Sequence, residues 1–270
     1  MDNKDVSNER KIYLKKMKKN KYLVYLTQVG ILVVLITVWE IAANLEIIDS
    51  FMTSQPSRIF KTLFNFSSND IFKHIWVTTY ETVMGFLLGT IIGIIISIIL
   101  WWSDFLSKVF EPYLVVLNSL PKVALGPIII LWVGAGTPAI IVMAIAISLV
   151  VTILENLNGF IKTDEELIKM AKTFKANKFQ ILTKIVIPAN ISTFINSLKV
   201  NIGLSLVGVI SGEFLVSKAG LGYLIVYGGQ VFKMDLVMTS VIILGVVAGI
   251  MYLTVIFLEK FILKSKKFSN

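Results

Sequence analysis

Long runs of apolar residues, separated by short charged segments, dominate the chain. Six runs have roughly 20 residues or more, the length a helix needs to cross a hydrocarbon core of about 30 Å. These runs, such as IIGIIISIIL, lack the alternation of polar and apolar positions that barrel strands require. The pattern therefore predicts an all-α polytopic membrane protein with transmembrane helices at 24–45, 76–101, 113–133, 139–157, 194–215 and 236–258.

The composition supports this interpretation. Hydrophobic residues make up 56% of the chain and charged residues only 16%, and the mean hydropathy is +0.80. These values lie outside the range of soluble globular proteins. The protein is therefore expected in the cell membrane.

The basic residues predict the orientation of the helices. Residues 1–21 are rich in lysine, have no apolar stretch with a cleavage site, and are expected to remain in the cytoplasm. With six spans, the lysine-rich loop 159–188 and the tail 259–270 fall on the same side, whereas segments 46–75 and 216–235 have no comparable positive excess. We expect a basic cytoplasmic N-terminal segment (1–21), a transmembrane domain (22–258) and a basic cytoplasmic tail (259–270). Topology and contact with anionic membrane lipid then account for the net charge of +9, and no nucleic acid is needed as a partner.

The residue types that carry catalytic and metal chemistry are scarce. The chain has no cysteine and a single histidine, His74, for which we expect a structural role at the membrane interface. No glycine is followed by lysine, so a G-x-x-x-x-G-K-[ST] phosphate-binding loop is absent from the sequence. We predict no catalytic residue and no metal site, and any ATP used by the protein would be bound by another chain.

One internal loop differs from the rest of the chain. Residues 159–188 are charged, helical in pattern and end in proline, although they lie between two apolar runs. The pattern predicts two short helices on the membrane surface that form a docking surface for a soluble partner.

Glycines recur at four-residue spacing inside three predicted spans. Such spacing places glycines on one helix face, where another backbone can approach closely. We expect tight packing within one subunit, with packing against a second copy across a transport path as the alternative. The residues concerned are Gly85, Gly89 and Gly93, then Gly208 with Gly212, and Gly245 with Gly249.

Charged residues within spans cost about 2.5–3.5 kcal/mol each near the bilayer centre and need an explanation. Glu81 and Glu155 lie near predicted span ends, so we expect them at the interface. Lys122 and Glu213 are better candidates for facing a polar cavity or for pairing with each other. The other two charges are Glu40 and Lys199.

Prolines predict a break in the third span. Pro121 and Pro127 flank Gly126, so this helix should be kinked or broken, as in helices that line transport paths. A purely structural kink is the alternative. The candidate pathway residues are Pro121, Lys122, Pro127, Lys199 and Glu213.

Three segments resemble a known family. LPKVALGPIIILWVGAGTPAII, EELIKMAKTFKANKFQILTKIVIPA and SGEFLVSKAGLGYLIVYGG, in this order, are similar to permease subunits of binding-protein-dependent ABC importers. The branch concerned imports nitrate, sulfonates, taurine, bicarbonate and thiamine precursors, and the resemblance covers residues 54–258. It implies the type I importer permease fold, a homodimer of permeases, two cytoplasmic ATPases that bind ATP and Mg²⁺, and an extracellular solute-binding protein.

The resemblance assigns loop 159–188 as the coupling loop, which in the family inserts into a groove on the ATPase. The family motif is Glu-Ala-Ala, three residues, Gly, then about nine residues to a hydrophobic-x-hydrophobic-Pro ending. Ala171 and the ending fit this motif, but the family's Glu, first Ala and Gly fall on Lys169, Met170 and Lys175. The coupling residues implied are Glu165, Glu166, Lys169, Met170, Ala171, Lys175, Ala176, Ile187 and Pro188, with Ile185 also part of the ending.

These departures leave several explanations open. One explanation is a compensating acidic residue on the ATPase, and another is weakened coupling. A third is that Glu165 or Glu166 substitutes for the missing carboxylate of the motif. Glu165 and Lys169 are also spaced to form an i,i+4 pair. Asn177 tolerates left-handed geometry and is a candidate for the turn that glycine makes in the family.

Other classes of membrane protein fit less well. A secondary transporter would show inverted repeats, an intramembrane enzyme would need a nucleophile or metal cluster, and a receptor or scaffold would not bind an ATPase. Lys122 and Lys199 favour a small anion such as a sulfonate, taurine or nitrate as the transported solute. A thiamine-precursor pyrimidine is the alternative.

Overall fold

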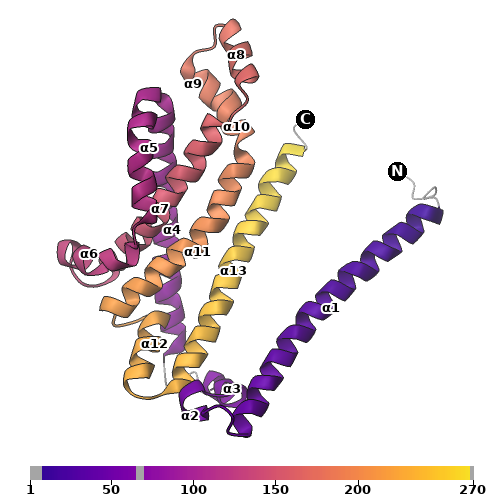
Figure 1. Cartoon of the computed structure of the whole chain (residues 1–270), viewed down its shortest axis with the longest axis vertical. Helices are drawn as coiled ribbons and strands as arrows, with labels where there is room; N and C mark the ends of the chain where they lie inside the picture. Colours follow the sequence, from indigo (N-terminus) through magenta and orange to yellow (C-terminus); the bar gives the residue numbers. More distant parts are fainter. Residues whose placement is uncertain (1–7, 65–69, 268–270) are drawn as a thin grey trace. The chain divides into compact units, whose positions relative to one another are not determined.

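The computed structural model describes residues 8–64 and 70–267, with side chains for 10–64 and 70–260. The parts of the predicted terminal segments and outer loop that fall at 1–7, 65–69 and 268–270 lie outside these ranges. The chain divides into two compact units, Met1–Phe64 and Asn65–Asn270. Every regular element in the described ranges is a helix (Figure 1), which confirms the all-α prediction.

The first unit consists of α1 (Asn8–Asn44), α2 (Ser50–Thr53) and α3 (Pro56–Phe64). Helix α1 continues without a break from the basic segment into the first predicted span. The Glu40 carboxylate in α1 accepts hydrogen bonds from the Ser57 backbone N–H at 3.0 Å and from Asn44 Nδ2 at 3.4 Å. This intramembrane charge therefore connects α1 to the first turn of α3.

The second unit contains the remaining helices. Its elements in chain order are α4 (Ile71–Trp102), α5 (Asp104–Ser119), the 3₁₀ turn η2 (Lys122–Leu125), α6 (Gly126–Val133), α7 (Thr137–Ile161), α8 (Glu165–Thr173), α9 (Lys178–Ile181), the π-helical turn η3 (Leu182–Val186), α10 (Ile187–Ala189), α11 (Ile191–Val216), α12 (Leu221–Gln230) and α13 (Met234–Lys267).

Five helices in the described residues are long and apolar enough to cross a membrane, and a bent pair supplies a sixth candidate. The pair is α5 followed by Lys122–Val133, and its two parts meet at 88°. The break lies at Pro121, which lacks a backbone N–H and disfavours helical geometry in the residue before it. About six spans are therefore confirmed. The predicted break in the third span is also confirmed, although this segment begins at Asp104 rather than at residue 113.

Helix α7 packs closely against α4 through small residues. On both helices these residues recur every four positions, so they meet in register along one face. A β-carbon added at any of the three α4 glycines would collide with a side chain of α7. The calculated approaches are 2.5 Å from Gly85 to Ala144 Cβ, 2.5 Å from Gly89 to Ser148 Oγ and 2.6 Å from Gly93 to Thr152 Cγ2.

Helix α11 covers another part of α7 in the same way. A β-carbon at Gly208 would lie 2.5 Å from Ala144 Cα, and one at Gly212 would lie 3.1 Å from Ile140 Cα. On α13, by contrast, a β-carbon at Gly245 or Gly249 would meet nothing within 4 Å. The expected packing of these two glycines within the subunit is therefore not found in the described part of the chain.

Buried polar side chains also connect α7 to α11. Asn156 Nδ2 donates to the Thr152 carbonyl at 2.8 Å and lies 3.4 Å from Ser197 Oγ, while Asn201 Nδ2 donates to Thr152 Oγ1. Water is scarce at this depth, so such groups have to find partners on neighbouring helices. They fix how α7 and α11 are rotated against each other.

Candidate functional site

The hairpin between α7 and α11, residues 162–189, is fixed locally by caps. Helix α7 continues to Ile161, so the hairpin begins three residues later than predicted. The Asp164 carboxylate accepts from the Glu166 N–H at 2.8 Å and caps α8. Asn177 and Gln180 form a capping box at α9, with bonds of 2.8 and 2.9 Å. The two short helices predicted for this segment are thus present as separately capped elements.

The turn between α8 and α9 differs from the sequence prediction. Lys175 has the left-handed backbone conformation, with φ of 57°. Asn177 is extended, with φ of −76° and ψ of 167°, so its proposed role in the left-handed turn is wrong. The turn instead stays at the position of the family's glycine, where lysine is strained relative to glycine.

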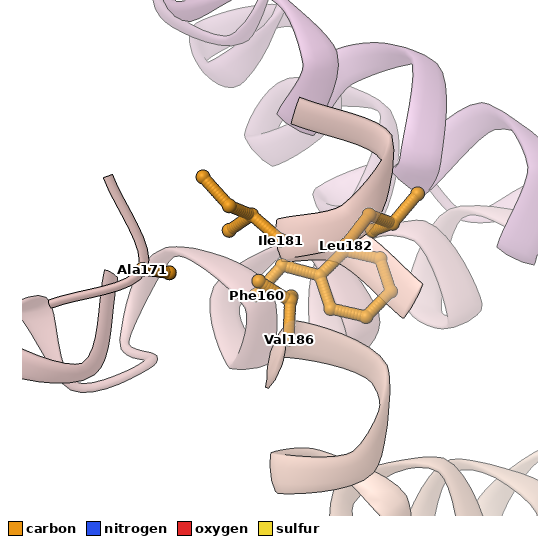
Figure 2. Close-up of a cluster of buried hydrophobic side chains, with 5 residues drawn as sticks. All are labelled: Phe160, Ala171, Ile181, Leu182 and Val186. Atoms are coloured by element: carbon orange, nitrogen blue, oxygen red, sulfur yellow. The ribbon is translucent and has the colours of Figure 1, made fainter. Parts of the chain in front are cut away.

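A buried apolar cluster lies under the hairpin. Figure 2 shows its five members, which come from the end of α7, from α8 and from the α9–η3 segment. Phe160 is 1% exposed and stacks at a tilt against Phe194, with ring centroids 5.5 Å apart. The cluster attaches both arms of the hairpin to the helix that enters it. Its members are Phe160, Ala171, Ile181, Leu182 and Val186.

A polar contact closes the base of the hairpin. The buried Asn190 amide donates through Nδ2 to Thr163 Oγ1 at 2.8 Å and to the Val186 carbonyl at 2.9 Å. A β-carbon at Gly159 would lie 2.8 Å from Asn190 Oδ1. Glycine at this position therefore allows the two ends of the hairpin to approach each other.

The outer face of the hairpin carries large apolar side chains. Leu167 and Met170 are three residues apart on α8, and Phe174, four residues after Met170, is the C-cap residue of this helix. The three side chains therefore follow the spacing of one helix face. Phe179 on α9 is also exposed. Phe174 is 79% exposed and Phe179 is 62% exposed. We call these four residues the apolar set.

The charged residues of the implied coupling motif surround the apolar set. Lys169 Nζ donates to Glu165 Oε2 at 2.9 Å in an exposed i,i+4 pair. The hydrogen bond and charge of Lys169 lower the pKa of Glu165. Glu166 and Lys175 are exposed, whereas Ala176, Ile187 and Pro188 are half-buried on the inner side of the hairpin.

The start of α12 lies at the opposite end of the second unit from the hairpin (Figure 1). Three side chains hold it in place. The Gly220 N–H donates to His74 Nδ1 at 2.9 Å, the Leu221 N–H to Thr78 Oγ1 at 2.7 Å, and the Gly222 N–H to Glu213 Oε2 at 2.6 Å. Thr78 in turn donates to Glu213 Oε1 at 2.6 Å. Three N–H groups that a helix leaves unpaired at its start are therefore satisfied by α4 and α11.

Glycine at position 220 is required by this arrangement. Gly220 has φ of 118°, and a β-carbon there would lie 2.2 Å from Glu213 Oε1.

Lys122 Nζ donates to the Asn118 carbonyl at 3.0 Å. The predicted pairing of Lys122 with Glu213 is therefore wrong, because Glu213 is bonded to Thr78 and to the start of α12 instead.

Other intramembrane charges have different surroundings. Glu81 is fully buried among the helices of the second unit. Its polar neighbours are Thr137 and Glu213, but neither Glu81 oxygen has a hydrogen-bond partner of suitable geometry in the described residues. Glu155 is half-buried, and its Oε2 atom also lacks such a partner there.

The candidate pathway residues are not gathered at one place. Lys199 of α11 forms a 2.7 Å ion pair with Glu259 of α13. Pro121 and Pro127 are exposed beside half-buried Lys122 in the bent segment, whereas Glu213 of α11 contacts the start of α12. The structure thus divides these residues among three regions.

Comparison with known proteins identifies the family. The model of the binding-protein-dependent transport system inner membrane component matches residues 85–267. The chain belongs to this family. It is a multi-pass membrane permease of a binding-protein-dependent ABC importer and has no catalytic role of its own. In such systems a partner ATPase binds the ATP.

Individual relatives agree with this assignment. The permease is 28% identical over 222 residues to a probable ABC transporter permease protein of Haemophilus influenzae, covering 82% of this chain and 90% of the relative. It is 25% identical to the putative aliphatic sulfonates transport permease protein SsuC of Bacillus subtilis, covering 86% and 84%. A crystal structure of a bacterial ABC transporter that imports alginate matches with a TM-score of 0.64 and 17% identity over 93% of this chain and 99% of that chain. The type I importer permease fold is thereby confirmed.

Some contacts of the permease were not predicted from its sequence. His74 and Thr78 are four residues apart in α4 and both accept from the start of α12. Their spacing was the available signal, but the bonding partners are more than 140 residues away in the chain. Lys178, which contacts Trp102, was counted only among the lysines of the loop.

Proposed function

We propose that this permease is driven by a cytoplasmic ABC ATPase that binds the hairpin, and that it moves a small anion into the cell. Its partners are two ATPases carrying ATP and Mg²⁺, a second copy of the permease and an extracellular solute-binding protein. The observation that carries the proposal is the exposure of the apolar set, Leu167, Met170, Phe174 and Phe179, outside the membrane-spanning helices.

The position of the apolar set favours a protein partner. Exposed apolar residues on long spans are covered by lipid, but the hairpin is a charged segment between spans. Burying an apolar side chain of this size is worth about 1.5–3 kcal/mol. A helix that presents anchors at three- and four-residue spacing is suited to a groove on another protein. The groove of an ABC ATPase is the partner that the family suggests.

The construction of the hairpin supports transmission of force. The apolar cluster under α8 and the Asn190–Thr163 contact connect its arms to the ends of α7 and α11. ATP binding would close the ATPase dimer and push the hairpin, and the attached helices would then move as rigid bodies. Hydrolysis would return the bundle to its inward-facing state.

The altered motif has a specific explanation in this proposal. Lys169 stands at the position of the family's acidic residue and pairs with Glu165. The negative charge of Glu165 is therefore neutralised within the hairpin. Glu166 is exposed, and its side chain has no partner among the described residues. Glu166 would therefore supply the carboxylate for a basic residue of the ATPase. Lys175, Met170, the buried Ala171 and the half-buried residues Ala176, Ile187 and Pro188 would shape and support the contact.

The proposed solute is a sulfonate, taurine or nitrate. The Bacillus subtilis relative is named for aliphatic sulfonates. Lys122, in the bent segment with Pro121 and Pro127, is the cation proposed to face the path. Lys199 contributes less positive charge, because Glu259 neutralises it.

The proposed topology follows the positive charges. Residues 1–21, the hairpin and residues 259–270 would lie in the cytoplasm, with their lysines against anionic lipid, and residues 22–258 would form the transmembrane domain. The start of α12, held by Glu213, would then lie toward the outside, at the end where the binding protein docks.

Co-purification with the cognate ATPase tests the proposal. Phe174→Asp places a charge in the apolar set and should reduce capture of the ATPase at least tenfold, since about 1.4 kcal/mol corresponds to tenfold and a buried phenylalanine contributes more. The control is Thr173→Asp, which adds the same charge at the adjacent exposed position outside the set.

Two results would contradict the proposal. The first is failure of the folded wild-type permease to capture the ATPase, and the second is equal loss of capture in both variants. Uptake by the complete transporter in proteoliposomes then tests the solute. Competition by taurine or alkanesulfonates supports an anion, and competition by an aminopyrimidine alone refutes it.

A further inference from the structure

Lys178 connects the hairpin to a helix that is not its neighbour in the chain. Its Nζ donates to the Trp102 carbonyl at 2.6 Å and lies 5.8 Å from the centre of the Trp101 ring. Trp102 is the last residue of α4. The carbonyls at the end of a helix lack intrahelical partners and carry partial negative charge, so a lysine is well suited to this place.

The backbone on both sides of this contact is fixed. Lys178 is the first residue of α9, directly after the Asn177 capping box. On the other side, Ser103 follows Trp102 and caps α5 by accepting from the Leu106 N–H at 3.3 Å. We call the segment Trp101–Asp104 the α4–α5 corner. A contact between two rigid segments transmits displacement, whereas a contact between mobile ones would absorb it.

The contact spans a region where packing is incomplete. A groove of about 340 Å³ separates the hairpin from the α4–α5 corner, and Lys178 lies in its wall together with Trp101, Asp104, Ile168 and Lys172. Some apolar contact exists, because Trp101 and Ile98 pack against the cluster under the hairpin. The Lys178 bond supplies a directional connection where close packing does not.

The corner leads to the bent part of the bundle. The hairpin directly follows α7 and precedes α11 in the chain, whereas η2, α6 and α7 separate α4 and α5 from it. Helix α5 begins at the corner and ends at the 88° bend before Lys122. Movement of the hairpin can reach α4 and α5 through α7, because Ile153 and Leu157 of α7 pack with Leu100 and Leu114. The Lys178 bond adds a direct connection from the hairpin to the corner.

We propose that Lys178 is a positioning residue that carries movement of the hairpin to the α4–α5 corner, so that α5 and the bent segment follow α7 and α11. This inference rests on the proposed function, because it takes the ATPase as the source of the movement. Loss of the Lys178 contact would leave ATP hydrolysis in place while the bundle fails to open fully.

The variants for the test are Lys178→Met, Lys178→Arg and Lys172→Met in the complete transporter. Methionine keeps an apolar chain but cannot donate, and arginine keeps the charge and the donors. Lys172 lines the same groove, and its side chain makes no hydrogen bond within the described residues, so it is the matched control. We expect Lys178→Met to lower uptake per ATP hydrolysed by about tenfold, the scale of one charge-assisted hydrogen bond, with partial recovery in Lys178→Arg.

A second measurement detects the movement itself. The chain contains no cysteine, so spin labels can be placed at single introduced cysteines without background. The pair Phe105→Cys with Leu253→Cys reports on α5, and Thr173→Cys with Leu253→Cys reports on the hairpin. In the wild-type background, ATP should change both distances. In Lys178→Met, the change at position 105 should be smaller than in the wild type and the change at position 173 retained.

The outcomes separate the inference from the proposed function. If the wild-type permease does not capture the ATPase, both fail. If Lys178→Met captures the ATPase and retains normal uptake per ATP and the normal change at position 105, the inference is overturned while the proposed function stands. An equal loss of coupling in Lys172→Met would likewise overturn it, since the effect would then not depend on the bond to Trp102.

Discussion

Replacing Gly208 with alanine tests the close packing of α11 against α7. The added β-carbon would lie 2.5 Å from Ala144 Cα, 3.0 Å from Ala144 N and 3.1 Å from the Met143 carbonyl oxygen. All three atoms belong to the backbone of α7, so no side-chain rotation relieves the collision. The helices have to move apart. Gly203 lies in the same helix, and a β-carbon there would meet nothing within 4 Å.

The two positions differ only in this packing term. Alanine is favoured over glycine in a helix interior by about 1 kcal/mol, and this gain applies to both variants. Overpacking a well-filled interface costs about 1–3 kcal/mol, and a backbone collision belongs at the upper end of that range. Gly208→Ala should therefore be about 3 kcal/mol less stable than Gly203→Ala.

Thermal unfolding of the detergent-purified permease measures this difference. One kcal/mol corresponds to about 2–4 °C for a domain of this size, so the two melting temperatures should differ by roughly 6–12 °C. Gly203→Ala should melt at or above the wild-type temperature. Equal melting temperatures for the two variants would refute the packing of α11 on α7 described above.

Two further predictions concern charged groups. Glu213→Ala should speed hydrogen exchange of the Gly222 amide, because it leaves this buried N–H donor unpaired at a cost of about 1–3 kcal/mol. Glu213→Gln should largely preserve the protection of this amide. Similar exchange rates in the two variants would contradict the contact. Lys169 lowers the pKa of Glu165 below its ordinary value of 4.5, so the pair should persist above that pH and be lost as the pH falls below it. Carbon-13 NMR titration of the full chain should give Glu165 a lower pKa in the wild type than in Lys169→Met, and an unchanged pKa would count against the pair.

Local features of this permease could be predicted from its sequence. Hydropathy acts over about 20 consecutive residues. Most of the predicted span ends therefore lie within a few positions of the observed helix ends. Pro121 marked the break in the third span, because proline removes a backbone donor whatever surrounds it. The motifs in the last two thirds of the chain were also sufficient to indicate the family.

Contacts between distant segments required the tertiary structure. Glu213 appeared to be a partner for Lys122, yet its carboxylate bonds to Thr78, which is 135 residues away. Gly208 and Gly245 have similar surroundings in sequence, but only Gly208 faces another helix closely in the described chain. Four-residue spacing identifies a face of a helix without identifying what that face meets.

The hairpin combines both kinds of information. Its charge, its ending in proline and its place between spans were visible in the sequence, because they depend on neighbouring residues. The left-handed turn at Lys175 and the bond from Lys178 to Trp102 were not, because both depend on how α8 and α9 pack on α4 and α7. The sequence by itself determined which segments cross the membrane and which one leaves it, since hydropathy and charge act locally. Only the tertiary structure decided the partners of each polar group, since these follow from the rotation and close packing of whole helices.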